Sequence, residues 1–201
     1  HMYVGKMDSD WTKPVQVALT QLPGDFYMNH GFCKGHWQGR EVAFTASREG
    51  VFVWTPPEKA DGEWQMRQLL NMPVSDIALA DLDGDGKQEM AVLMPFHGNE
   101  FHIFRQNGDE WQQVYSYPVE NDFYHAVIAG TIHGEKVFAG GARKLAADLF
   151  VIRWDASQGQ YAAQQLEAGP GPSNLALLNA PDGDLLLSAN RMIFEAAVYR
   201  F

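Results

Sequence analysis

The strongest chemical signal in this sequence is a short acidic run, Asp81-Leu-Asp-Gly-Asp-Gly-Lys-Gln-Glu89. Its carboxylates repel one another unless a hard cation lies among them, and calcium takes about six to eight oxygen ligands. The two glycines of the run allow backbone angles that a Cβ would forbid, so the loop can wrap around one ion. The run therefore predicts a calcium site. Its expected ligands are the side chains of Asp81, Asp83, Asp85 and Glu89 and the main-chain carbonyl of Lys87.

The segments on either side of the run show what kind of calcium loop to expect. In an EF-hand the closing Glu is the twelfth loop residue and a helix begins there. Here Glu89 is the ninth residue of the run, and apolar segments of strand length, 77–80 and 90–94, lie on both sides. The ion is therefore expected to join the two strands of a β-hairpin, and a structural role is favoured over a catalytic one.

A second set of polar residues recurs along the chain at separations of 46, 49 and 49 residues: His30, Asp76, His125 and Asn174. Two imidazoles, a carboxylate and an amide oxygen form a donor set that suits Zn²⁺, Mn²⁺ or Fe²⁺, so the set is a possible second metal site. In an enzyme, His30 and His125 would be the catalytic candidates. The alternative is that the four side chains hydrogen-bond to one another and to trapped water, as buried polar groups must.

Cationic side chains form a third recurring set, placed just after the second strand of each unit described below. Guanidinium groups pair with planar oxyanions, so the set could bind a carboxylate or a polyhydroxylated anion. The alternative is ordinary ion pairs within turns, because acidic residues follow at 49, 100, 148 and 195. The members of the cationic set are Arg48, His97, Arg143, Lys144 and Arg191.

These residues are positioned by a repeat of about 48 residues, a period typical of propeller blades. Each unit has a first strand, a second (41–46, 90–94, 137–141, 185–189) and a third (51–54, 101–104, 149–154, 196–201). An outer strand that opens on Trp64, Trp111 or Tyr161 follows in three units. Short alternating strands between polar turns predict an all-β protein, and four strands per unit predict a β-propeller. First strands line the channel of a propeller, so equivalent residues are expected to converge there.

The ends of the chain leave the number of blades open. The pair His1-Met2 is expected to be a cloning remnant, and 3–201 a single propeller domain. The expected blades are about 24–73, 74–121, 122–169 and 170–201, with residues 8–23 completing the last one and closing a four-bladed ring. Closure would remove exposed sheet edges. The alternative is part of a larger propeller, in which 3–7 belongs to a blade upstream.

The acidic run on a hairpin resembles the FG-GAP/VCBS repeat family, whose propeller blades carry such a loop between their first two strands. The segments 123–127, 140–144, 171–174, 189–191 and 195–199 also resemble bacterial proteins similar to the propeller domain of aldos-2-ulose dehydratase, a metal-dependent sugar lyase. That fold has more blades, and its cupin domains are absent here. The second resemblance implies His30 and His125 as metal ligands or acid–base groups. It also implies sugar-oxygen contacts from Arg143, Lys144 and Arg191.

Composition excludes several classes of function. The chain has 15 basic and 25 acidic residues, a formal charge of −10, and no basic stripe, so nucleic-acid binding is not expected. No apolar run approaches the roughly 18 residues of a membrane span, and no leader segment opens the chain. Cys33 is the single cysteine, which excludes an internal disulfide. A soluble protein is expected, either cytoplasmic or secreted with its signal removed.

Three functions from different classes fit these patterns. The favoured one is a calcium-stabilised FG-GAP-type propeller that binds a small polar ligand, a sugar or sugar acid, at the central ring. The second is a metal-dependent carbon–oxygen lyase acting on sugars, in which the ring holds a metal ion and one His acts as general base. The third is a protein-interaction propeller. Self-association or a missing propeller half stays open as a partner under each of the three. Enzyme status is left open.

Overall fold

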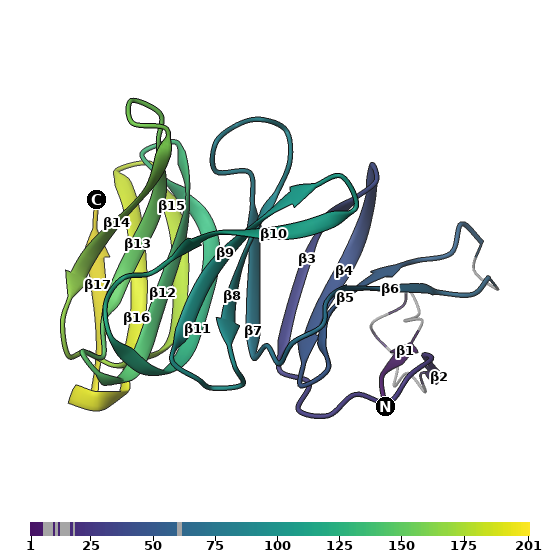
Figure 1. Ribbon diagram of the computed structural model, residues 1–201. Coiled ribbons are helices and arrows are strands. Elements are labelled where there is room, and N and C mark those ends of the chain that lie inside the picture. Colours follow the sequence, from purple (N-terminus) through teal and green to yellow (C-terminus); the bar gives the residue numbers. More distant parts are fainter. Residues whose placement is uncertain (6–9, 11, 13–16, 18, 60–61) are drawn as a thin grey trace.

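The computed structural model describes residues 1–5, 10, 12, 17, 19–59 and 62–201. These residues form an all-β structure of antiparallel sheets, as predicted (Figure 1). The described part contains no α-helix, and one 3₁₀ turn, η1, covers Arg191–Ile193. None of its helical segments is long and apolar enough to cross a membrane.

Three consecutive units each form the expected four-stranded sheet, with strands hydrogen-bonded in chain order. The first sheet consists of β3 (Gly31–Trp37), β4 (Arg40–Ser47), β5 (Gly50–Thr55) and β6 (Gln65–Leu70). The second sheet consists of β7 (Asp76–Ala80), β8 (Glu89–Met94), β9 (Glu100–Asn107) and β10 (Glu110–Ser116). The third sheet consists of β11 (Asn121–Ile132), β12 (Glu135–Leu145), β13 (Leu149–Asp155) and β14 (Gln160–Glu167).

The fourth sheet has three strands: β15 (Pro172–Ala180), β16 (Gly183–Asn190) and β17 (Glu195–Arg200). Residues 8–23 were expected to supply its outer strand. Instead β2 (Leu19–Gln21) pairs with β1 (Tyr3–Gly5), and these two strands form a separate small sheet. The rest of the expected strand, at 13–16 and 18, lies outside the described residues. Among the described residues, therefore, the fourth sheet is not completed from the N-terminal segment.

The first strands of the four units lie next to one another, β3 beside β7, β7 beside β11 and β11 beside β15 (Figure 1). Glycine permits this close approach at two points. A Cβ on Gly31 would lie 2.8 Å from the Cα of Asp76, and one on Gly130 would lie 2.4 Å from Cδ1 of Leu177. The repeat thus brings residues near the starts of these strands together, although they are about 48 residues apart in the sequence.

Apolar side chains fill the spaces between successive sheets. Phe44, Met90 and Val92 belong to the cluster between the first and second sheets, and Phe138 and Phe150 to that between the second and third. Burial of one such side chain contributes roughly 1.5–3 kcal/mol, so these interfaces hold the sheets in place. A smaller cluster, which includes Leu149 and Leu186, joins the third and fourth sheets.

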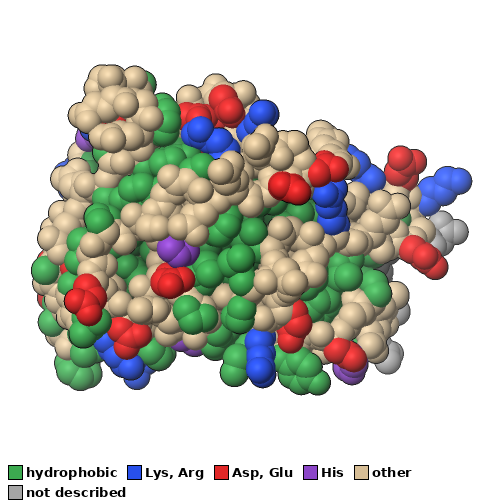
Figure 2. Space-filling model, viewed as in Figure 1, with side chains coloured by type: hydrophobic (Ala, Val, Ile, Leu, Met, Phe, Trp, Pro, Cys, Tyr) green, Lys and Arg blue, Asp and Glu red, His purple; other side chains and the backbone are tan. Residues whose placement is uncertain are grey.

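The two outer sheets differ in what covers them. On the first sheet, Leu22 and Phe26 from the N-terminal segment pack against Phe52 and Trp54. On the fourth sheet, Leu178, Leu187 and Val198 are 52%, 39% and 62% exposed on the face turned away from the third sheet. In the described part of the chain no apolar cluster joins the first and fourth sheets, and no ring closes. Lys and Arg side chains are scattered on the face shown in Figure 2.

Candidate functional site

The acidic run forms the turn between β7 and β8, at the hairpin position predicted for it. The carboxylate of Asp81 accepts hydrogen bonds from the backbone N–H groups of Gly84, at 2.9 Å, and Gly86, at 3.0 Å. Both glycines have positive φ, 75° and 86°, which a residue with a Cβ rarely adopts. The turn is therefore wound around the Asp81 carboxylate.

Three of the predicted calcium ligands converge. Asp81, Asp83 and Glu89 each offer an oxygen, and these oxygens lie within 4.8 Å of one another. Asp85 is exposed, and its carboxylate accepts a hydrogen bond of 2.8 Å from the Lys87 N–H on the outer part of the loop. The loop thus presents a three-carboxylate centre with a fourth carboxylate at its rim.

Arg105 is the residue at this loop that the sequence analysis missed. It stands directly opposite Glu89 in the β8–β9 register, and its Nε lies 3.2 Å from Glu89 Oε1. Its guanidinium also pairs with Asp83, and the Tyr161 hydroxyl bonds to both Arg105 (3.0 Å) and Glu89 (3.2 Å). Burial raises the pKa of the Glu89 carboxyl, which is 1% exposed. One arginine beside three carboxylates leaves two negative charges, which matches a divalent cation.

At the opposite end of the first strands, three histidines from three different sheets come together. His30 lies just before β3, His97 in the turn between β8 and β9, and His125 on β11. Each offers a ring nitrogen within 4.8 Å of the other two. The ring centroids are 5.0 Å apart for His30 and His97, 5.2 Å for His97 and His125, and 5.8 Å for His30 and His125. We call these three residues the histidine cluster.

The histidine cluster differs from the ring expected from the repeat. His97 was expected to contact a ligand from the turn, yet it stands among the candidate metal ligands. Asp76 is not one of the residues whose possible ligand atoms converge in the cluster. Its Oδ1 accepts a hydrogen bond from the backbone N–H of Ile77, at 2.9 Å. Asn174 is exposed. It alternates with residues of β15 that pack on the third sheet, so its side chain lies on the uncovered face of the fourth sheet.

Two arginines of the cationic set lie close to the histidine cluster. Arg143, at the end of β12, stacks its guanidinium over the Phe123 ring at 4.7 Å, and the ammonium of Lys144 lies 5.2 Å from the same ring. The positive charges of Arg143 and Arg191 both act on His125. Arg48 is exposed, and its charge acts on the carboxylate of Glu49.

The alternative of ordinary turn ion pairs fits only part of the cationic set. Lys144 pairs with Asp122 at 3.5 Å, and the charge of Arg48 acts on its neighbour Glu49. Within the described residues, Arg143 and Arg191 form no ion pair. The acidic residue expected to pair with Arg143, Asp148, is instead fully buried and accepts hydrogen bonds from neutral side chains, Gln165 at 2.6 Å and Tyr117 at 3.0 Å.

Burial and mutual repulsion shape the titration of the histidine cluster. Burial lowers the pKa of His97, and the charges of His30 and His125 lower it further. Burial also lowers the pKa of His125, together with the charges of Arg143 and His30. Both imidazoles are therefore neutral at pH 7, with lone pairs free for a proton or a metal ion. Burial raises the pKa of nearby Asp76 to about 6, partly offset by its bond to Ile77 and by His30.

Two buried side-chain nitrogens near this end have no hydrogen-bond partner within the described structure: Nδ1 of His97 and Nε of Arg143. Buried donors and acceptors are almost always paired, because an unpaired one costs about 1–3 kcal/mol. Both residues pack against the Phe123 ring, so the two unpaired nitrogens lie at the same end of the structure.

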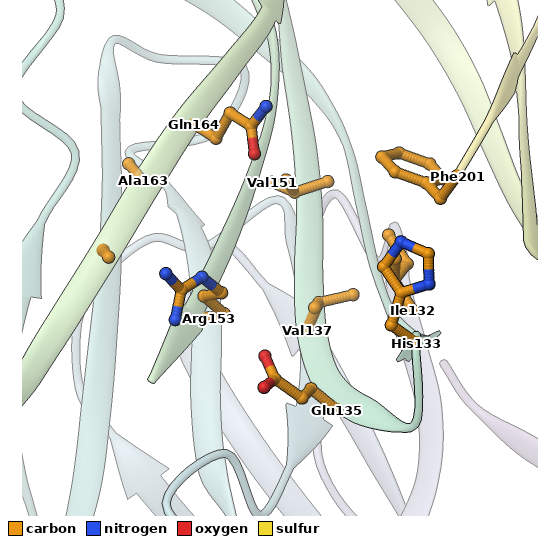
Figure 3. Close-up of a pocket in the computed structure, with 10 residues that line it drawn as sticks. Ile132, His133, Glu135, Val137, Val151, Arg153, Ala163, Gln164 and Phe201 are labelled. Atoms are coloured by element: carbon orange, nitrogen blue, oxygen red, sulfur yellow. The ribbon is translucent and has the colours of Figure 1, made fainter. Parts of the chain in front are cut away.

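A separate groove of about 450 Å³ lies at the far end of the third sheet, beside the C-terminal Phe201 (Figure 3). Figure 3 shows Arg153 and Glu135 on one side and His133 and Phe201 on the other. Ile132, in its wall, is seven residues along β11 from His125, about 23 Å at 3.3 Å per residue. The groove is therefore distinct from the histidine cluster.

No family model and no curated protein matches this chain. Among solved structures, a bifunctional GH43-CE protein of Bacteroides eggerthii is similar, with a TM-score of 0.52 and 13% sequence identity. The match covers 81% of this chain and 23% of that one, so the chain spans less than a quarter of that structure's length. A likeness at this level of identity concerns the fold.

Proposed function

We propose that this chain is a calcium-stabilised β-propeller of the FG-GAP type that binds a sugar acid at the end carrying the histidine cluster. The observation that carries the proposal is the unpaired cationic group there. Arg143 and Arg191 lie close enough for their positive charges to interact with each other and with the neutral His125, in a chain with a formal charge of −10. Arg143 has a buried nitrogen without a partner, and Arg143 and Arg191 form no ion pair in the described structure.

The chemistry of this end favours a carboxylate that carries hydroxyl groups. Guanidinium groups bind carboxylates through two parallel hydrogen bonds, and imidazole nitrogens can bond to hydroxyl groups. Phe96 and Phe123 contact His97, with ring centroids 4.4 Å and 4.8 Å away, and supply apolar surface beside it. Apolar walls with a few converging polar groups are typical of small-molecule sites.

A sugar is the proposed ligand class because of the resemblance to sugar-lyase propellers, and the similar solved structure, a bifunctional GH43-CE protein, is compared for its fold alone. The chain spans only part of that protein, so its activity is not carried over to this chain. The assignment to the FG-GAP/VCBS type is part of the proposal. Its support is the position of the acidic run, which lies between the first and second strands of a four-stranded sheet, where the resemblance places it.

The acidic run fits calcium by its donor set. Asp81, Asp83 and Glu89 supply converging oxygens, the ligand type that a hard cation prefers, and Asp85 stands at the rim of the loop. A calcium ion there would hold the β7–β8 hairpin closed. Gln88 of the same loop accepts a hydrogen bond of 3.0 Å from the backbone N–H of His36, so the ion would also support the contact with the first sheet.

Isothermal titration with galacturonate and galactose tests the proposed ligand class. We expect the acid to bind, the neutral sugar to bind at least about tenfold more weakly, and Arg143→Ala to lose binding of the acid by at least about tenfold, a difference of about 1.4 kcal/mol. Arg153→Ala, in the separate groove, is the matched control and should bind as the wild type does. Equal binding of both sugars, or full binding by Arg143→Ala, would contradict the proposal.

A lyase reaction at the same end is the second candidate, and the hydrogen bond of His125 favours it, because Nδ1 lies 2.9 Å from the Ser173 carbonyl oxygen and Nε2 keeps its lone pair. An imidazole that is neutral at pH 7 can act as a general base on the proton next to a carboxylate. Incubation of the protein with oligogalacturonate, followed by mass spectrometry, distinguishes the two. Products that carry a new double bond identify a lyase, whereas unchanged oligosaccharide together with uronate binding in the titration identifies a binding protein.

A further inference from the structure

We propose that the histidine cluster, His30, His97 and His125, binds one divalent transition-metal ion, with Zn²⁺ the best match. This ion is separate from the calcium proposed for the acidic run. The ligands come from the first, second and third sheets, so a bound ion would tie three sheets together at the start of their first strands. The proposal does not depend on which sugar binds nearby.

The spacing of the rings fits tetrahedral zinc. Zinc binds imidazole nitrogen at about 2.0–2.1 Å, which places the centroids of neighbouring imidazole ligands about 5.2 Å apart. The three centroid separations in the cluster are 5.0, 5.2 and 5.8 Å. The nitrogens lie within 4.8 Å of one another, whereas zinc requires about 3.3–3.4 Å, so the His30 and His97 rings must rotate about their side-chain torsions to complete the geometry.

A hydrogen bond already orients one of the three ligands. Nδ1 of His125 lies 2.9 Å from the carbonyl oxygen of Ser173. A carbonyl oxygen can only accept, so Nδ1 carries the proton and Nε2 is left with its lone pair. Histidine ligands of metal ions usually donate their second N–H to a carbonyl or carboxylate in this way, which fixes the tautomer and the ring.

His97 is held in position by a strained, hydrogen-bonded turn. Its φ is 49°, in the left-handed region that residues with a Cβ rarely occupy. The N–H of Gly98 donates to the carbonyl of Pro95 at 2.7 Å, and the Gly98 carbonyl accepts from the N–H of Tyr124 at 2.9 Å, next to His125. Nδ1 of His97 is buried without a partner in the described structure. The turn thus holds an imidazole with an unused nitrogen beside two others.

The donor set and its surroundings favour a catalytic or ligand-binding type of zinc site. Three imidazoles suit zinc, and three protein ligands leave a fourth position open for water or a bound molecule. The charges of Arg143 and Arg191, which reach His125, favour an anion at that position. A carboxylate bound there would contact both the metal ion and the arginines, which connects this site with the proposed sugar-acid ligand.

Metal titration of the full chain tests the proposal. The protein is first stripped with a chelator, then saturated with calcium to fill the acidic run, and titrated with ZnCl₂ in the absence of sugar. We expect one equivalent to bind, and the Co²⁺ form to show the visible absorption of a tetrahedral site. His97→Ala and His30→Ala should each weaken binding by at least about 100-fold, because loss of even a supporting contact costs about 10–100-fold.

His36→Ala is the matched control, because His36 is an exposed histidine outside the cluster, and it should bind zinc as the wild type does. A calcium-dependent melting temperature equal to that of the wild type shows that each variant is folded. His30 is exposed and precedes β3, so its variant remains informative if His97→Ala fails to fold. Absence of stoichiometric zinc binding, or wild-type binding by a folded His97→Ala or His30→Ala, would overturn the proposal. Because no sugar is present, neither result bears on uronate binding.

Discussion

The clearest test of the calcium loop is the substitution Glu89→Gln. The Glu89 carboxylate is one of three that converge, and it is 1% exposed at the point where the loop enters β8. Glutamine keeps the size of the side chain, and its amide oxygen can still accept the 2.8 Å hydrogen bond from the Leu82 N–H, although its NH2 group replaces the Oε1 that accepts from Arg105. The variant should therefore fold with the loop in place while one charged ligand is lost.

The size of the effect follows from mass action. Calcium at about 100 times its Kd stabilises the wild type by about 2.7 kcal/mol. In a domain of this length each kcal/mol shifts Tm by about 2–4 °C, so calcium should raise the wild-type Tm by about 5–11 °C. If the substitution weakens calcium binding about 100-fold, the same calcium concentration contributes only about 0.4 kcal/mol, or about 1–2 °C.

Thermal denaturation followed by circular dichroism, with calcium and with chelator, measures both shifts. Glu110→Gln is the matched control, because Glu110 is an exposed carboxylate at the start of β10, outside the loop. We expect it to retain the full calcium-dependent shift. Two results would refute the reasoning: a wild-type Tm that does not respond to calcium, or a Glu89→Gln variant that retains the full response.

Three further results are expected. Arg105→Met should lower the stability of the calcium-free protein by about 1–3 kcal/mol, because the carboxylates of Asp83 and Glu89 lose their cationic partner. The same substitution should enlarge the calcium-dependent Tm shift, and a smaller shift would contradict this. Burial raises the pKa of Cys33 from 9.0 to about 12, so at pH 8 the native thiol should react with a disulfide reagent on the order of 10³-fold more slowly than the unfolded chain. The thiol of the unfolded chain ionises first as pH rises, so the contribution of Cys33 to folding stability is present below pH 9 and is lost between pH 9 and 12. Equal reaction rates for the native and unfolded thiols would refute the raised pKa. Phe150→Ala should cost about 3–5 kcal/mol in urea denaturation, because the fully buried ring stacks on Tyr117 at 3.8 Å, whereas Phe194→Ala, at a side chain 95% exposed, should change stability by less than about 0.5 kcal/mol.

Local patterns in the sequence were sufficient for the strands and for the position of the acidic loop. Alternating apolar residues and Gly/Asp turns determine β-hairpins over short distances, so each second and third strand was found where the repeat predicted it. The same local logic placed the run from Asp81 to Glu89 on a hairpin. It could also have found Arg105, because the hairpin register sets that residue opposite Glu89.

The composition of the site depended on contacts between sheets, which no local pattern contains. Equivalence by repeat predicted Asp76 and Asn174 beside His30 and His125, but that argument assumes a closed ring in which every first strand has neighbours on both sides. The fourth sheet is uncovered on one face, so Asn174 lies in the open. His97 enters the cluster because a turn with positive φ directs it across to the next sheet.

The amino-acid sequence by itself therefore determined an all-β chain of four-stranded units and an acidic hairpin loop, because hydrophobic alternation and turn chemistry act between neighbours. Only the tertiary structure decided which polar side chains meet. The packing of β3, β7 and β11 brings His30, His97 and His125 within reach of one another, although 95 residues separate the first from the last. The pairing of Leu19–Gln21 with Tyr3–Gly5 was likewise a tertiary outcome, set by which apolar face the N-terminal segment covers.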